Sequence, residues 1–314
     1  MTPDEANRLL HLSREARWAY PTSQGRPVHW DTREEWVTKL VDEQGHFADA
    51  ARFLGQNGWQ DRALELASNV WRLWILSNDM PGGRQFLSIL LSKPGKPSRA
   101  RALALYGDGL FAYRQGQVRE SRIRNEEALG IAEQLNDPEA LVLSHLGLSR
   151  VDLEQGNYQS ARYHASKAQK LSHDQDPALG QAPLFMEASA NRMLENYETA
   201  ASLYRQSVEL NRKLNDTGMV VAELSNLGFV EVHLGNVDRA EQCFAESEKL
   251  ASKLTDPYSQ AMSLLTKAAV AYLKGNHAQA ESLLATSEKT LKDSGLKPGP
   301  DDKFEIDWLK IKLA

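Results

Sequence analysis

Residues 224–244, with the sequence LSNLGFVEVHLGNVDRAEQCF, contain the pattern that decides the fold. Gly228 lies seven residues before a short loop string at 235–237, and Ala240 and Phe244 follow that loop. Small residues on both sides of a turn allow two helices to cross closely, and an aromatic ring fills the space beyond the crossing. The stretch therefore predicts an antiparallel helix pair.

The same pattern recurs along the chain with a period of about forty residues. Equivalent loops open at Gly116, Gly156, Glu195, Gly235 and Gly275, at spacings of 40, 39, 40 and 40 residues. An aspartate, which can cap a following helix, closes each of the first four units: Asp137, Asp176, Asp216 and Asp256. A fixed period of this length predicts a stacked array, and such arrays act mainly as binding surfaces.

Composition narrows the class of protein further. The 314 residues are 41% hydrophobic and 25% charged, with a formal net charge of −5. Nucleic-acid binding relies on a positive field, so we expect no DNA or RNA partner. The single cysteine, Cys243, excludes an internal disulfide and fits a reducing compartment. No signal peptide and no apolar run of about 18 residues is visible, so a cytoplasmic protein without a membrane partner is expected.

The array predicts four regions of unequal regularity, and no stretch shows strand-like alternation. Helix pairs are expected near 99–136, 138–174, 177–215, 217–255 and 257–293. The predicted regions are an N-terminal helical cap at 1–58, an irregular first helix pair at 59–98, five regular repeats at 99–295 and a C-terminal capping helix at 296–314.

Local signals mark helix boundaries near both ends. Residues 1–20 read as an amphipathic helix that the Pro- and Gly-containing segment 21–27 interrupts. The capping-box pattern at 31–34 predicts the next helix start. At the other end, Asp301 or Asp302 can cap a short helix that carries Phe304, Trp308 and Ile311 on one face. The helix is expected to cover the open apolar side of the last repeat, with docking elsewhere as the alternative.

The repeated units resemble tetratricopeptide repeats. The residues that carry the resemblance are Leu224, the Leu227–Gly228 pair, the 235–237 turn, Ala240 and Phe244, and the likeness spans about 60–293. The repeat is longer than the common 34-residue form and is similar to the regulatory arms of bacterial signal-transduction ATPases, including the maltose-regulon activator and its relatives. The resemblance implies an all-α, right-handed α-solenoid of stacked antiparallel helix pairs with a sensing or partner-binding role.

The candidate catalytic and cofactor-binding motifs lack the structural context or the residue spacing that such sites require. Residues 107–112 fit a dinucleotide fingerprint, but such a fingerprint has meaning only after a strand, whereas this one lies inside a predicted helix. The eight histidines form no zinc-binding spacing, and no nucleophile elbow is present. We therefore expect no enzyme activity, no cofactor and no bound metal.

The first helix of each repeat supplies the candidate binding site. In tetratricopeptide arrays, ligands usually meet the first-helix face that is turned away from the second helix. Arginine and aromatic residues dominate binding hot spots, although part of this face could instead be core. Mapped through the repeat register, the predicted partner-binding groove consists of Tyr106, Leu110, Tyr113, Arg114, Leu146, Arg150, Phe185, Arg192, Phe229, His233 and Tyr272.

Three functions are compatible with such a groove. The favoured one is a non-enzymatic regulatory module that binds a protein or peptide partner on its concave surface. The first alternative is a receptor arm that senses a small molecule or signalling peptide. The second is a structural solenoid that self-assembles, with a homodimer through the terminal helices as its simplest form.

Overall fold

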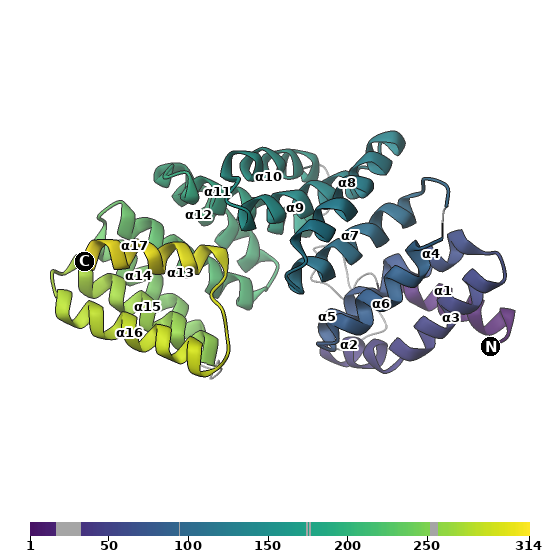
Figure 1. The fold of residues 1–314 in the computed structure, drawn as a ribbon, viewed down its shortest axis with the longest axis horizontal. Helices are drawn as coiled ribbons and strands as arrows, with labels where there is room; N and C mark the ends of the chain where they lie inside the picture. The colour runs from purple at the N-terminus through teal and green to yellow at the C-terminus, as the bar shows by residue number, and fades with distance from the viewer. Residues whose placement is uncertain (17–32, 94, 174, 176, 252–256) are drawn as a thin grey trace. The chain divides into compact units, whose positions relative to one another are not determined.

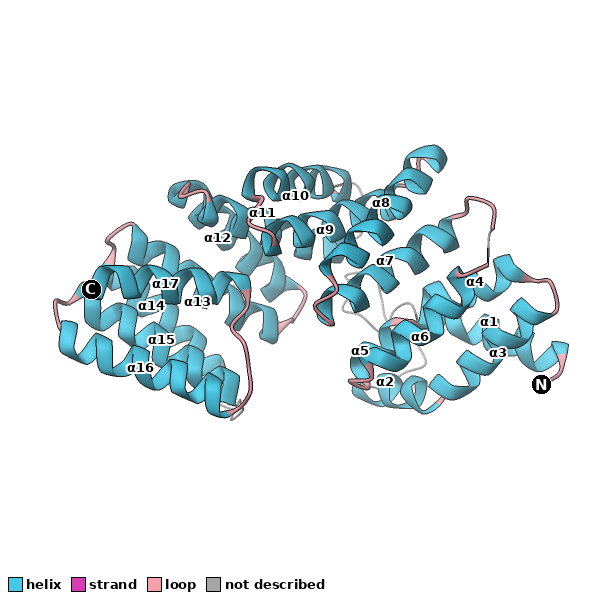
Figure 2. Ribbon diagram, viewed as in Figure 1, coloured by secondary structure: helices cyan, strands magenta, loops and turns pink. Residues whose placement is uncertain are grey.

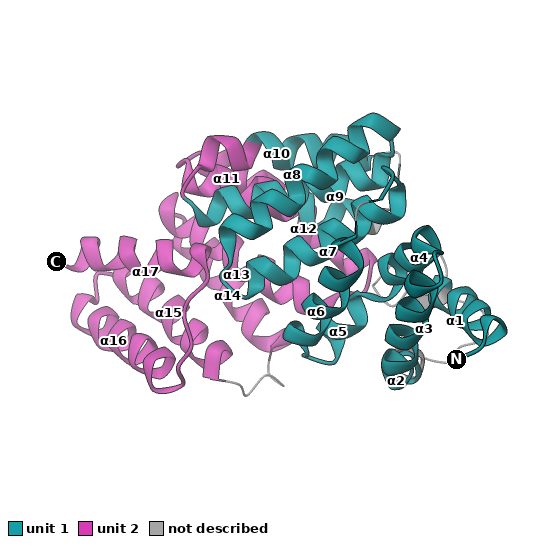
Figure 3. Cartoon of the chain, turned by 45° about the vertical axis from the view of Figure 1, so that its right-hand side comes forward, with its two compact units in different colours: residues 1–155, 163–183 teal, residues 156–162, 184–314 magenta. Residues whose placement is uncertain are grey.

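The computed structural model describes residues 1–16, 33–93, 95–173, 175, 177–251 and 257–314. Within those residues every regular element is a helix and no strand occurs (Figures 1 and 2). The all-α fold of stacked antiparallel helix pairs predicted from the repeat is therefore confirmed. The chain divides into two compact units, coloured separately in Figure 3. Unit 1 comprises Met1–Gln155 and Tyr163–Pro183, and unit 2 comprises Gly156–Arg162 and Leu184–Ala314.

Unit 1 begins with short helices and continues with long ones. Its helices are α1 (Pro3–Ala16), α2 (Arg33–Asp42), α3 (Gln44–Gln56), α4 (Gln60–Val70), α5 (Arg72–Leu76), α6 (Met80–Leu91), α7 (Arg99–Arg114), α8 (Val118–Leu135), α9 (Pro138–Glu154), most of α10 (Tyr158–Ser172), the 3-10 helix η2 (Pro177–Gly180) and the start of α11 (Gln181–Met193). The predicted break at 21–27 and the first half of the 31–34 capping box lie outside the described residues.

Unit 2 holds the clearest helix pairs and the C-terminal helix. It contains the start of α10, α11 from Leu184 onward, α12 (Tyr197–Lys213), α13 (Thr217–His233), α14 (Val237–Leu250), α15 (Pro257–Leu273), α16 (His277–Asp293) and α17 (Pro300–Leu313). None of the described helices of either unit has the length and apolar character that crossing a bilayer requires.

The loop strings are the turns within the helix pairs. Gly116, Gly156, Gly235 and Gly275 adopt φ values between 73° and 75°, in the left-handed region where glycine carries no steric penalty. At the other end of the pairs, the side chains of Asp137 and Asp216 accept hydrogen bonds from backbone N–H groups three residues on. The predicted aspartate caps are therefore present at these two positions, whereas Asp176 and Asp256 lie outside the described residues.

Small residues permit the helix crossings, as the repeat pattern predicts. A Cβ atom at Gly228 would lie 2.3 Å from Cε1 of Phe244, so the ring occupies the space that the glycine leaves. In the first regular pair, where the aromatic is replaced, Asn125 takes this place. Its side chain lies against Gly109 on α7 and Gly147 on α9. Two glycines and one asparagine thus join three consecutive helices.

The fingerprint-like residues 107–112 lie within α7 and serve packing. A Cβ atom at Gly107 would lie 2.9 Å from the Trp71 ring, and one at Gly109 would lie 2.7 Å from Asn125 Nδ2. No strand precedes α7 in the described part of the chain. These glycines lie inside a continuous helix, where they allow close helix packing.

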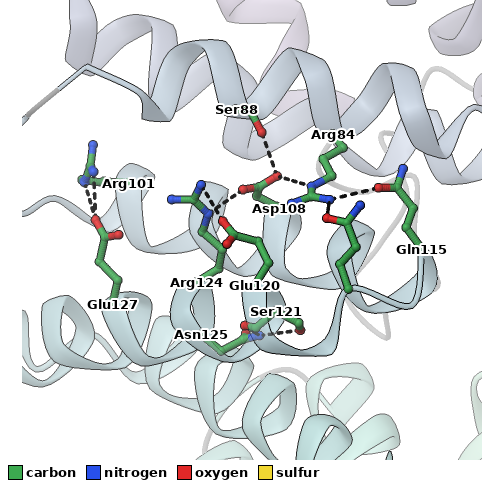
Figure 4. A network of polar contacts seen from close by, with 11 residues as sticks. Arg84, Ser88, Arg101, Asp108, Gln115, Glu120, Ser121, Arg124, Asn125 and Glu127 are labelled. Atoms are coloured by element: carbon green, nitrogen blue, oxygen red, sulfur yellow. Dashed lines mark hydrogen bonds and ion pairs between the residues drawn. The ribbon is translucent and has the colours of Figure 1, made fainter.

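A buried carboxylate on α7 connects three helices of unit 1 (Figure 4). Asp108 is 0% exposed, and its Oδ2 lies 2.8 Å from Nε of Arg124 on α8. Its Oδ1 lies 3.7 Å from Nε of Arg84 on α6 and accepts a hydrogen bond from Ser88 at 3.3 Å. Burial raises the pKa of Asp108, although Arg124 and Arg84 oppose the rise. We call this network, in which Arg84, Arg124 and Ser88 contact the buried Asp108 carboxylate, the Asp108 clamp.

Candidate partner-binding groove

The C-terminal helix α17 contacts the first helices of three pairs in unit 2, namely α11, α13 and α15. Its Asp301 accepts a hydrogen bond from Ser189 of α11 at 2.9 Å. Its Glu305 lies 2.9 Å from His233 of α13, and its Trp308 packs edge-on against Tyr272 of α15 with ring centroids 5.5 Å apart. We call the surface of α11, α13 and α15 that α17 covers the first-helix face of unit 2.

Arg192 of α11 is the central charge of this face. Its side chain is 0% exposed, and Nη1 donates a hydrogen bond to Oδ1 of Asn226 at 3.0 Å. Nη2 lies 3.5 Å from Oδ2 of Asp301, and Nε lies 3.6 Å from Oε1 of Glu305. Burial acts to lower the pKa of Arg192, but neighbours that include Asp301 and Glu305 raise it above its usual value. The guanidinium is therefore a buried cation whose charge is balanced by the carboxylates of α17.

The two ion pairs of Arg192 are longer than hydrogen bonds. Within the described residues, neither Nε nor Nη2 has a hydrogen-bond partner, and neither does Oε1 of Glu305. A buried charge without hydrogen bonds destabilises the folded state, by a free energy on the order of kilocalories per mole, relative to a buried charge whose hydrogen bonds are all made. The charges of α17 thus neutralise Arg192 without satisfying its donors.

His233 lies in an aromatic box that α17 completes. Its side chain is 2% exposed, with Nε2 against Glu305. The imidazole stacks on Tyr197 with centroids 4.5 Å apart and an interplanar angle of 5°, and Trp308 meets it edge-on at 4.5 Å. Phe304 lies 5.9 Å away on the same helix as Trp308. Tyr197 of the box comes from α12, whereas Phe304 and Trp308 come from α17.

A third carboxyl group of α17, that of Asp302, forms a hydrogen bond with a tyrosine and no ion pair among the described residues. Tyr258 of α15 donates a hydrogen bond to Oδ2 of Asp302 at 2.5 Å, and its oxygen accepts one from the backbone N–H of Gly299 at 3.1 Å. Burial raises the pKa of Asp302 to about 6, with Asp301 adding to the rise, while Tyr258 and Arg192 oppose it. Three acids of α17 therefore face one arginine and one histidine.

Apolar residues of α17 extend the core of unit 2. Ile306 and Leu309 are 4% and 1% exposed and belong to the same buried cluster as Phe229 of α13 and Ala269 of α15. Ile311, by contrast, is 75% exposed. One stripe of α17 therefore covers apolar surface, as a capping helix would, and the adjacent acidic stripe reaches Arg192 and His233.

The predicted groove residues divide between the two units. Arg192, His233 and Tyr272 contact α17, while Phe229 packs in its apolar cluster. Phe185 packs against Tyr204 with centroids 6.2 Å apart. The remaining six lie in unit 1: Tyr106, Leu110 and Leu146 are buried, Tyr113 and Arg150 are half-buried, and Arg114 is exposed. A partner-binding role for these eleven residues stays a prediction.

Arg150 and Tyr113 are neighbours in unit 1. The Arg150 guanidinium lies 5.8 Å from the centre of the Tyr113 ring, and the Tyr113 hydroxyl donates a hydrogen bond to Glu154 at 3.2 Å. Nearby, the Nδ1 atoms of His145 and His164 are 2.9 Å apart, and burial, with His164, lowers the pKa of His145 to about 4. In the described part of the chain, no group of histidine, cysteine and acidic side chains could hold a metal ion.

The residues of α17 that enter the face were missing from the sequence-based site. Asp301, Glu305 and Trp308 follow one another at intervals of four and three residues, which places them on one side of a helix. This spacing was a usable signal, because an acidic and aromatic stripe complements a groove that contains arginine and histidine.

Comparison with known proteins supports the fold. Residues 220–293 match the family model described as tetratricopeptide repeat. No curated protein sequence matches the chain. Among solved structures, a signal-transduction ATPase with a tetratricopeptide repeat sensor from Pyrococcus horikoshii is 17% identical, with a TM-score of 0.58 over 90% of this chain and 46% of that one.

Two further structures align over most of both chains. A Rap protein complexed with Competence and Sporulation Factor is 14% identical, with a TM-score of 0.56 over 88% of this chain and 80% of that chain. The quorum sensor NprR from B. thuringiensis, in its apo form, is 15% identical, with a TM-score of 0.55 over 88% of this chain and 81% of that chain. These likenesses establish that the chain is a tetratricopeptide-like solenoid.

Proposed function

We propose that this tetratricopeptide-repeat chain is a regulatory, non-enzymatic module that binds a protein or peptide partner on the first-helix face of unit 2. The observation that carries the proposal is the seating of α17. A short amphipathic helix lies on this face and contacts Ser189, Arg192, His233, Tyr258 and Tyr272. The face thus has the shape and charge to hold a helix.

Helix-in-groove recognition explains why such a face suits a partner. An amphipathic helix presents its anchors about one turn apart, and the first helices of successive repeats offer matching sites. Arg192 and the aromatic rings beside His233 are residue types that supply most of the free energy at protein interfaces. We therefore place the partner site on the face that α17 covers.

A ligand-sensing arm is the second candidate. The link between α16 and α17 covers residues 294–299 and includes Gly295, Pro298 and Gly299. A ligand that binds the first-helix face would have to displace α17, and the displaced helix would report the binding. The structures of the Rap protein and of NprR share the fold, which is compatible with this mechanism.

The test is binding of a helical peptide supplied in trans. A fluorescein-labelled peptide with the sequence of residues 297–314 is titrated with the full-length protein and with its Trp308→Ala variant. A tethered helix competes at an effective concentration in the millimolar range, so the wild type is expected to bind the peptide weakly. Loss of the Trp308 ring contacts with His233 and Tyr272 frees the face. Apparent affinity should rise at least tenfold.

Ile311→Ala provides the matched control on the same helix, because Ile311 is 75% exposed. This variant should bind the peptide as weakly as the wild type does, and circular dichroism should show equal helix content in all three proteins. Absence of peptide binding by the Trp308→Ala variant, with its fold intact, would contradict the proposed function.

A further inference from the structure

We infer that the partner of the first-helix face is an acidic amphipathic helix that carries a carboxylate at one position, a second carboxylate four residues later and an aromatic residue three residues after that. Asp301, Glu305 and Trp308 of α17 occupy these three positions, which makes α17 an internal mimic of the partner and its competitor. The inference rests on the proposed function and names the chemistry of the ligand.

The charge of the face selects acids. Arg192 is 0% exposed and sits at the centre of the contact, where an apolar or basic helix would leave the guanidinium buried without a counter-charge. A buried unpaired charge costs several kilocalories per mole. His233 adds a second site one helical turn along, with Nε2 pointing at Glu305. Carboxylates four residues apart on a helix reach both groups.

The aromatic position is defined equally well. Trp308 fits between the rings of His233 and Tyr272, edge-on to both, with centroid distances of 4.5 and 5.5 Å. Edge-to-face contacts of this kind add about 0.5–1.5 kcal/mol each beyond the area that they bury. A partner with an aromatic residue at this position gains the same contacts.

The imperfect fit of α17 leaves room for a better ligand. In the described part of the chain, Nε and Nη2 of Arg192 have no hydrogen-bond partner, and carboxylate oxygens of α17 lie 3.6 and 3.5 Å from them. A partner helix without the short tether to α16 can approach until these pairs become hydrogen bonds. It can also omit the third acid, Asp302, whose carboxylate accepts a hydrogen bond from the neutral Tyr258 hydroxyl. Both differences favour a partner helix that displaces α17 from the first-helix face of unit 2.

The experiment compares peptide variants on one protein, so that every receptor is folded in the same way. The probe is the labelled 297–314 peptide, and the receptor is the full-length Trp308→Ala variant. Peptides carrying Asp301→Asn or Glu305→Gln should bind about tenfold more weakly, because each leaves Arg192 with one carboxylate fewer, and Glu305→Gln also leaves His233 without its own. A Trp308→Ala peptide should lose at least as much.

Two control peptides separate recognition from general charge effects. Among the described residues Asp307 forms its ion pair with Lys303 of its own helix, and its side chain is 51% exposed, so Asp307→Asn should bind like the wild-type peptide. Asp302→Asn removes an acid from the same helical turn as Asp301 but keeps an oxygen that can accept the Tyr258 hydrogen bond. Because the Asp302 carboxylate is buried beside Asp301, this peptide should bind more tightly than the wild-type peptide at neutral pH. A helix-dipole effect alone would weaken the Asp301 and Asp302 variants alike.

The outcomes distinguish the inference from the function on which it rests. If all peptides bind within a factor of two of one another, the acidic-aromatic specificity is wrong, while the groove function stands. If no peptide binds, both are wrong. Light scattering of the wild type at increasing concentration should show a monomer. A dimer that the Trp308→Ala substitution abolishes would assign the face to α17 of a second copy and overturn the inference of a separate partner.

Discussion

Asp108 and Glu223 are both carboxyl groups with 0% exposure, but their surroundings differ in charge. Asp108 in unit 1 lies between Arg84 and Arg124. Glu223 in unit 2 accepts hydrogen bonds from Ser207 at 2.6 Å and Asn211 at 2.9 Å. Burial raises the pKa of Glu223 to about 8, and these two hydrogen bonds only partly oppose the rise. Loss of the charge should therefore destabilise the protein at Asp108 and stabilise it at Glu223.

Removal of the Asp108 carboxylate should destabilise unit 1. Asp108→Ala leaves Arg84 and Arg124 facing a buried cavity without their shared anion, at a cost of roughly 3 kcal/mol. Chemical denaturation followed by circular dichroism measures the loss. The matched control is Asp49→Ala, which breaks an ion pair with Arg52 whose side chains are more than half exposed and should cost less than about 1 kcal/mol. Equal costs for the two substitutions would contradict the clamp.

Removal of the Glu223 charge should stabilise unit 2 in alkaline solution. The folded-state pKa of Glu223 lies above its unfolded value, so the native state binds more protons, and its stability falls as pH rises from about 4.5 through 8. Glu223→Gln keeps an oxygen that accepts hydrogen bonds from Ser207 and Asn211. Because glutamine does not ionise, the stability of this variant should not fall as pH rises through this range. Its melting temperature should exceed that of the wild type by several degrees at pH 8.5, corresponding to roughly 2 kcal/mol.

The difference should shrink at pH 5.5 and nearly vanish at about pH 4, where the wild-type carboxyl group is protonated in the folded and the unfolded protein alike. Glu209→Gln on the exposed side of α12 serves as the control, since the Glu209 side chain is 58% exposed and pairs with Lys213. A melting-temperature difference that does not depend on pH would show that Glu223 is ionised in the folded protein across this range.

At the scale of elements, the helix pairs could be predicted from sequence because their determinants are local. The turn at Gly235, the cap at Asp216 and the small residue at Gly228 each act within one pair of helices, and each is read from a spacing. The position at which α17 docks depends instead on which surface of the array residues 300–313 can contact. That relation is tertiary, so the sequence predicted the helix without showing that its acids meet Arg192 and His233.

Docking of α17 should strengthen in mild acid. The pKa of Asp302 is raised to about 6 in the docked helix, so docking takes up a proton between about pH 4 and 6 and becomes stronger as pH falls. The wild-type 297–314 peptide should bind the Trp308→Ala protein about fourfold more tightly at pH 5.5 than at pH 7.5. The Asp302→Asn peptide should show no such gain, and the same gain for both peptides would remove Asp302 from the explanation.

At the scale of the whole molecule, repeat arrays divide their stability and binding among neighbouring units. The first-helix face lies within unit 2, whereas the Asp108 clamp lies within unit 1. Adding Asp108→Ala to the Trp308→Ala protein should therefore lower the resistance to denaturant and leave peptide affinity unchanged within about a factor of two. Loss of both properties together would show that the two units are energetically coupled.

Hydrogen exchange of the α17 amides in the full-length protein shows directly whether a bound helix displaces α17. The wild type is measured alone and with a saturating concentration of a 297–314 peptide that carries Asp302→Asn. If α17 holds the partner site, bound peptide expels it, and residues 303–313 should lose protection while α11 and α13 stay protected. If the peptide binds and α17 keeps its protection, the first-helix face of unit 2 is not the binding site.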